Sequence, residues 1–98
     1  MPLFVMIGHD GPDGPHRRGQ HRDQHVAYWT AMDEAGRVTL AGPIRDESNE
    51  ASTGAVIVFE AADLKDAREI VERDPYVAGG VFESLTVAPF KHVFPKKP

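Results

Sequence analysis

Apolar and polar positions recur with two different periods along this chain, and these periods predict a mixture of strands and helices. A run of five apolar residues at 3–7 is typical of a buried strand. Apolar positions three and four apart predict a helix over residues 20–35, which Gly36 ends. The other predicted elements are a strand at 37–41 ended by Gly42-Pro43, a strand at 54–60, a helix from Asp63 to Asp74, a short helical turn at 75–80 and a strand at 81–87, with an extension towards Phe90 left open.

Two polar segments separate these elements. Residues 8–19 contain four Gly and two Pro, a composition that predicts a flexible loop. Residues 44–53 are polar and rich in turn-forming types, so they predict a second loop. Residues 95–98 are expected to be a tail. We therefore expect one domain that spans residues 1–98.

The order strand, helix, strand, strand, helix, strand predicts an α+β fold of the ferredoxin-like βαββαβ type. Such a fold has a four-stranded antiparallel sheet with two helices on one face. The strand at 54–60 is almost entirely apolar, so we expect it to lie in the middle of the sheet and to be covered. Because the opposite face carries no helix, we expect a second copy to cover it in a homodimer.

Composition narrows the possible functions. The 98 residues carry a formal net charge of -4, and that balance argues against binding to nucleic acid or to an anionic membrane. The absence of cysteine excludes disulfides, a thiol nucleophile and thiolate metal sites. No apolar run approaches the about 20 residues of a membrane span, so we expect a cytoplasmic protein.

His25 and Asp74 are the leading candidates for chemistry. His25 lies on the inward stripe of the first helix, where its ordinary role would be that of a hydrogen-bonded core residue. Asp74 follows the second helix, and its ordinary role would be to cap a short helix that begins at Pro75. Helices packed side by side on a sheet can bring these residues together. Asp74 would then fix the imidazole tautomer and leave the other ring nitrogen as a proton acceptor.

Other sites receive less support from the sequence. His21 and His25 have a spacing common among metal ligands, and His9 could join them, but no third ligand is fixed, so no metal site is predicted. The glycines of residues 8–19 match neither phosphate-binding motif, so no cofactor is expected. Arg17, Arg18 and Arg22 could bind an acidic substrate where the first loop meets the first helix, but we expect Arg17 and Arg18 to be solvated, as such residues usually are.

Four segments together resemble one protein family. The segments are RDQHVAY at 22–28, AGP at 41–43, DPYVAGGVFE at 74–83 and PFKHVF at 89–94. With Asp10 after the first strand, they occur in the order found in the YciI-like (YCII-related) proteins and extend over almost the whole chain. The first loop is longer and richer in His, Gly and Pro than in typical members.

This resemblance implies a dimeric α+β barrel in which a His and an Asp share a pocket; these correspond to His25 and Asp74. It further suggests proton abstraction or elimination on a small cyclic or carbonyl-bearing molecule, with His25 as the base and acid. Arg22 would orient an anionic group. A non-catalytic ligand-binding module and a metal-dependent enzyme remain alternatives. Further pocket residues would be Asp10, Gly42 and Pro43.

Overall fold

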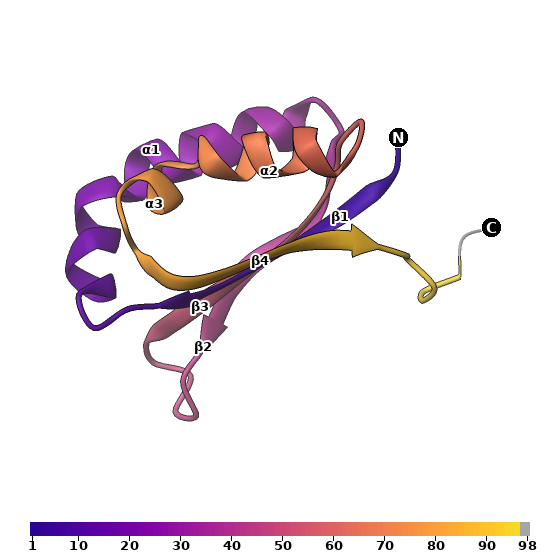
Figure 1. Ribbon diagram of the computed structural model, residues 1–98. Helices are drawn as coiled ribbons and strands as arrows, with labels where there is room; N and C mark the ends of the chain where they lie inside the picture. The colour runs from indigo at the N-terminus through magenta and orange to yellow at the C-terminus, as the bar shows by residue number, and fades with distance from the viewer. Residues whose placement is uncertain (97–98) are drawn as a thin grey trace.

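The computed structural model describes residues 1–96 as a four-stranded antiparallel sheet with helices on one face (Figure 1). The strands lie in the order β2-β3-β1-β4, so the ferredoxin-like prediction is confirmed. The elements are β1 (Leu3–Asp10), α1 (Gly14–Glu34), β2 (Val38–Arg45), β3 (Ser52–Glu60), α2 (Leu64–Glu72), α3 (Pro75–Ala78) and β4 (Phe82–Phe90).

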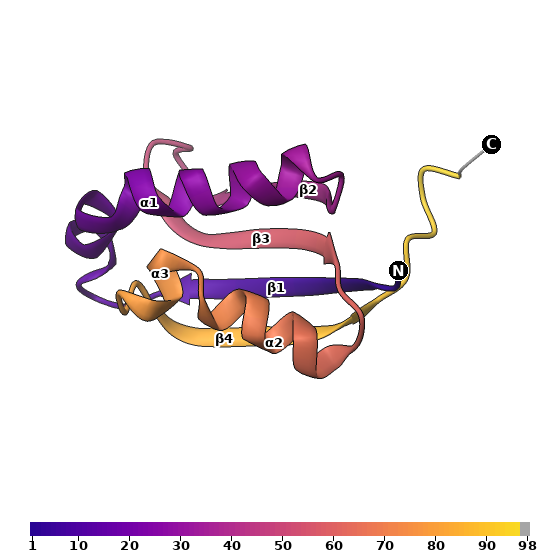
Figure 2. The same cartoon turned by 90° about the horizontal axis from the view of Figure 1, so that it is seen from above.

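The hydrophobic core lies between the sheet and the helices. Phe4 and Met6 of β1 pair with Phe59 and Ile57 of β3, and all four side chains are buried on the helix side. Trp29 of α1 packs edge-on against Phe59, with the ring centroids 5.4 Å apart. Seen from above, α1 covers the half of the sheet formed by β2 and β3, whereas α2 and α3 cover β1 and β4 (Figure 2).

Helix α2 begins as its sequence predicts. The Asp63 side chain accepts a hydrogen bond from the backbone N–H of Asp66 at 2.8 Å, and the Asp66 side chain accepts one from the N–H of Ala62 at 2.9 Å. These contacts satisfy two donors at the helix start. The apolar stripe of α2 is buried through Ala67, Ile70 and Val71.

The predicted loop over residues 8–19 is wrong for most of its length. Strand β1 continues to Asp10 and α1 already begins at Gly14, so only three residues connect them. Asp13 occupies the N-cap position and Pro15 lies in the first turn, where a missing N–H costs no helical hydrogen bond. The glycines and prolines therefore mark a helix start, and contacts of α1 with the rest of the fold offset the low helix propensity of Gly19.

Strand β2 also differs from its prediction, because it does not end at Gly42-Pro43. It continues to Arg45, and Pro43 pairs with Ala55 of β3. The strand lies at the edge of the sheet, where a proline is tolerated because one side of the strand has no partner. The predicted loop over 44–53 is correspondingly shortened to the residues between Arg45 and Ser52.

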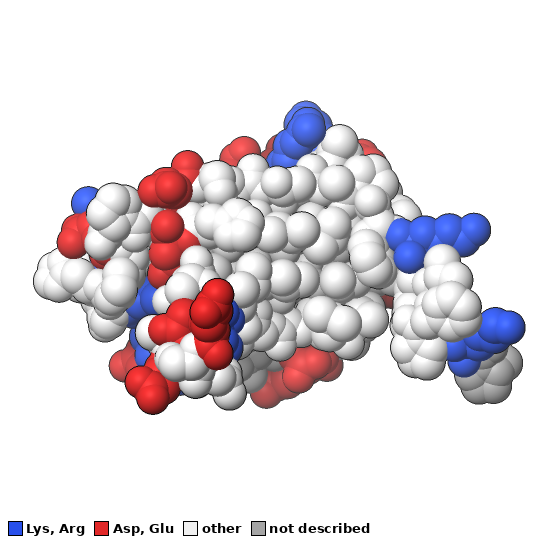
Figure 3. All heavy atoms as spheres, turned by 90° about the horizontal axis from the view of Figure 1, so that it is seen from below, with Lys and Arg blue, Asp and Glu red and all other residues white. Residues whose placement is uncertain are grey.

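The sheet face away from the helices is apolar and uncovered in this chain. The strand register shows which side chains lie on this face, because residues paired across neighbouring strands share a face. The central part of this face shows no charged side chain, and charged residues gather at its rim (Figure 3). The apolar residues of this face are Leu3, Val5, Ile7, Val56, Val58, Ala88 and Phe90, and the register also places Glu60 and Thr86 on it.

Two predictions concern the ends of the chain and the membrane. In the predicted tail at 95–98, residues 97–98 lie outside the described residues, and Pro95 and Lys96 belong to no helix or strand. Within residues 1–96, we find no helix with the length and apolar character that a membrane crossing requires.

Candidate functional site

The imidazole of His25 and the carboxylate of Asp74 are directly hydrogen-bonded. His25 Nδ1 lies 2.7 Å from Asp74 Oδ1. A carboxylate can only accept, so Nδ1 carries the proton and donates it to this bond. The contact joins the middle of α1 to the residue that caps α3, and the two helices pack against each other.

Asp74 is held by three donors and is completely buried. Besides His25, the indole Nε1–H of Trp29 donates to Oδ2 at 2.9 Å, and the backbone N–H of Tyr76 donates to Oδ1 at 2.9 Å. The last contact is the N-cap bond of α3, so the capping role and the contact with His25 coexist. A buried carboxylate without such donors would be strongly destabilising, and these donors fix its position.

The ring of His25 is fixed on a second side by Tyr76. The two rings are stacked with centroids 3.7 Å apart and planes inclined by 6°. The second ring nitrogen, Nε2, forms no hydrogen bond to the part of the chain that the structure describes. It also does not belong to the buried atoms that lack a partner, so it is open to solvent.

His25 borders a cavity of about 600 Å³ between α1, α3 and the β2–β3 side of the sheet. Gly42, Pro43 and Arg22, three of the residues expected in the pocket, lie in its wall. Trp29 and Tyr76 contribute aromatic surface. A cavity of this size accommodates a small organic molecule beside Nε2.

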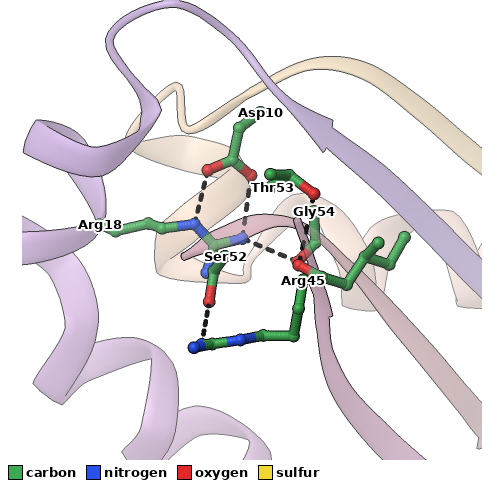
Figure 4. A network of polar contacts seen from close by, with 7 residues as sticks. Asp10, Arg18, Arg45, Ser52, Thr53 and Gly54 are labelled. Carbon is green, nitrogen blue, oxygen red and sulfur yellow. Dashed lines mark hydrogen bonds and ion pairs between the residues drawn. The ribbon is translucent and has the colours of Figure 1, made fainter. Parts of the chain in front are cut away.

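Arg18 and Asp10 form a buried ion pair at one end of this cavity (Figure 4). Arg18 Nε donates to Asp10 Oδ2 at 2.6 Å, and Nη2 donates to Asp10 Oδ1 at 2.9 Å and to the carbonyl of Gly54 at 2.9 Å. These contacts raise the pKa of the Arg18 guanidinium, chiefly through the hydrogen bond with Asp10. The expectation that Arg18 is solvated is therefore wrong.

Asp10 differs from its expected place. It is not one of the residues that line the cavity, and its side chain is almost fully buried behind Arg18. A carboxylate already paired with both nitrogens of a guanidinium fork is occupied by that contact. Asp10 therefore acts on the cavity only through the position of Arg18. Arg17, in contrast, is exposed and pairs with Asp13.

The histidines considered as metal ligands do not converge. His9 is exposed on β1. His21 packs so closely against Gly79 that a Cβ on this glycine would lie within 2.6 Å of His21 Nε2. Among residues 1–96, no three His, Asp or Glu side chains come together in a way that could hold a metal ion.

The sequence analysis set aside Arg18 as solvated and did not single out Trp29 and Tyr76 as residues of this site. Trp29 follows His25 by four positions and Arg18 precedes it by seven, so both share its helix face. That spacing was a usable signal for both. Nothing in the sequence showed that the Tyr76 ring would stack on His25.

The arrangement has the parts needed for general acid–base chemistry. The carboxylate of Asp74 orients the ring of His25, and no described residue bonds Nε2, which leaves this nitrogen able to take or give a proton. Within the described residues, no serine or threonine hydroxyl is bonded to His25. The geometry therefore supports proton transfer more directly than nucleophilic catalysis.

Comparisons with known proteins place the chain within a family. The family model described as the YCII-related domain matches residues 2–91. The chain is 34% identical over 97 residues to Protein YciI of Escherichia coli O6:H1, an alignment that covers 94% of this chain and 99% of that protein.

Solved structures show the same fold. The chain superposes with a TM-score of 0.82 on the 5-chloro-2-hydroxyhydroquinone dehydrochlorinase TftG of Burkholderia phenoliruptrix, in complex with 2,5-dihydroxybenzoquinone, at 24% identity over 93% of this chain and 95% of that one. It superposes with a TM-score of 0.56 on SnoaB, a cofactor-independent oxygenase of Streptomyces nogalater, at 8% identity over 98% and 100% of the two chains.

Proposed function

Since this chain belongs to the YCII-related domain family, we propose that it is an enzyme that transfers protons to and from a small molecule bound beside His25. One observation carries the proposal. His25 Nδ1 is bonded to a fully buried carboxylate, no described residue bonds its Nε2, and His25 lines a cavity of about 600 Å³. His25 is the general base and acid, and Asp74 is its positioning residue.

The reaction class is proton abstraction, either alone as in an isomerisation or followed by loss of a leaving group as in an elimination. In both cases Nε2 takes a proton from carbon or oxygen and returns it to the product or to water. The dehydrochlorinase with a similar fold supports elimination as one outcome. Arg22, Gly42 and Pro43 border the ligand in this proposal.

The test compares His25→Gln with His21→Gln, a variant of a second histidine one helical turn earlier that does not line the cavity. Two assays serve: chloride release from 5-chloro-2-hydroxyhydroquinone, and deuterium uptake from D₂O into small carbonyl compounds. We expect His25→Gln to lower the rate by about 10²–10⁴-fold, the usual contribution of a general acid–base group. His21→Gln should leave it unchanged.

Two results would contradict this function. Turnover that survives His25→Gln would remove His25 from the chemistry. Binding of the quinol substrate without any His25-dependent turnover would instead favour the alternative, a non-catalytic ligand-binding module.

We also propose that a second copy of the chain covers the apolar sheet face. A largely apolar face, with Val5, Val58 and Ala88 in its middle row, is costly to leave in water. A positively or negatively charged partner surface would gain little free energy from contact with this face, whereas the identical face of a second copy matches it in polarity. The occupant is thus another copy, related by a two-fold axis.

A further inference from the structure

The cavity beside His25 has a positive border in a chain of negative net charge. Three arginines and one carboxylate line it, although the whole chain carries -4. Low-dielectric walls concentrate the field of such groups within a cleft. The lining residues concerned are Arg18, Arg22, Arg45 and Asp33.

Arg18 is the best fixed of these arginines. Its Nε and Nη2 are committed to Asp10 and to the carbonyl of Gly54, and its side chain is only 14% exposed. The nearby Tyr76 hydroxyl also helps to raise the pKa of the guanidinium group. Because Arg18 itself lines the cavity, it places a fixed positive charge at the cavity border.

The guanidinium group of Arg18 and the imidazole of His25 both lie against the ring of Tyr76. The guanidinium carbon of Arg18 is 5.1 Å from the centroid of this ring, and the centroid of the His25 ring is 3.7 Å from it. Both side chains also line the same cavity, so a ligand bound there lies beside both.

We propose that Arg18, positioned by Asp10, selects anionic ligands for this cavity by binding a carboxylate or enolate oxygen with its guanidinium group. The carboxylate of Asp10 offsets the positive charge of Arg18. Arg22 forms no ion pair with the described residues, so its charge keeps the border of the cavity positive. The substrate class is then a small planar acid or enol with its reacting position towards His25. The placement of the reacting position towards His25 rests on the proposed function, whereas the selection of anions by Arg18 does not.

Benzoate and benzamide are suitable probes because they have almost the same shape and differ in charge. Binding is followed by NMR through the indole N–H of Trp29, which lines the cavity. We expect benzoate to bind about 10-fold more tightly than benzamide, as a charge-assisted hydrogen bond provides. Arg18→Gln should abolish this preference and leave benzamide binding unchanged.

Arg17→Gln is the matched control, because it removes the same charge from the neighbouring position, where the side chain is exposed and outside the cavity wall. It should keep the full preference for benzoate. If Arg18→Gln fails to fold, the Nε–H signal of Arg18 in the wild-type protein provides the second test, since benzoate should shift it and benzamide should not.

Equal affinities for the two probes, an equal loss in Arg17→Gln, or no benzoate binding in the millimolar range would overturn the inference. Repeating the benzoate and benzamide titrations with His25→Gln distinguishes a failure of this inference from a failure of the proposed function. Benzoate selection that persists there supports Arg18 as its source, and selection lost there assigns the anion preference to His25 instead.

Discussion

Replacing Trp29 with Phe tests how far the buried carboxylate of Asp74 depends on its donors. The indole N–H donates to Asp74 Oδ2 at 2.9 Å, and it is the sole hydrogen bond that the described residues make to this oxygen. Phe retains an aromatic ring against Phe59 but cannot donate. The variant therefore leaves one oxygen of a fully buried carboxylate unsatisfied.

The expected cost follows from this contact. A hydrogen bond to a charged group contributes about 1.5–3 kcal/mol, and shrinking a buried indole to a phenyl ring adds about 1 kcal/mol. We expect Trp29→Phe to lower the free energy of unfolding by about 2–4 kcal/mol. Urea denaturation followed by far-UV circular dichroism measures it, because the variant lacks tryptophan fluorescence.

Tyr28→Phe is the control at the adjacent position. It removes the hydroxyl that donates to the backbone carbonyl of Ile70 at 2.6 Å, a bond between neutral groups. Its loss should cost about 0.5–1.5 kcal/mol. If Trp29→Phe costs no more than Tyr28→Phe, the carboxylate does not depend on the indole and the reasoning is refuted.

Two further predictions concern pH and assembly. Burial raises the pKa of the Tyr28 hydroxyl above its usual value of 10.0, so the folded state holds this proton more tightly than the unfolded chain does. The stability that this shift provides is fully present below the usual pKa and is lost as the pH rises through the pKa of the folded state. In denaturation experiments above pH 10, the free energy of unfolding should therefore fall less in Tyr28→Phe than in the wild type. Val5→Glu places a charge in the apolar sheet face and should convert the proposed dimer to a monomer in light scattering, whereas Ala31→Glu, on the exposed side of α1, should not. A monomeric wild type, or a dimeric Val5→Glu variant, would contradict this assembly.

The elements with a clear hydrophobic period were predictable from the sequence. The apolar run of β3 and the Asp63–Asp66 capping pair of α2 carry local signals, and the structure follows them. The start of α1 was not predictable in the same way, because Gly and Pro near Gly14 favour both a loop and a first helical turn. Contacts with distant residues decide between the two.

Those distant contacts also explain what was missed in the site. Arg18 is fixed by Asp10 and by the carbonyl of Gly54, which lies 36 residues away in the chain. A helical period says which face Arg18 occupies, but it does not say what lies opposite. The proximity of His25 to Asp74 could be expected, because the fold type alone brings those helix positions together.

Part of the cavity wall lies on a different element of the fold from His25 and Asp74. His25 and Asp74 are held by α1 and α3, whereas Val38–Pro43 on the outermost strand form much of the wall. An edge strand can change its side chains or shift its register without disturbing the helix core. Exchange of a few residues along β2 would therefore alter which molecule enters while the imidazole and its carboxylate stay in place, so new ligand preferences are accessible to this scaffold through one strand.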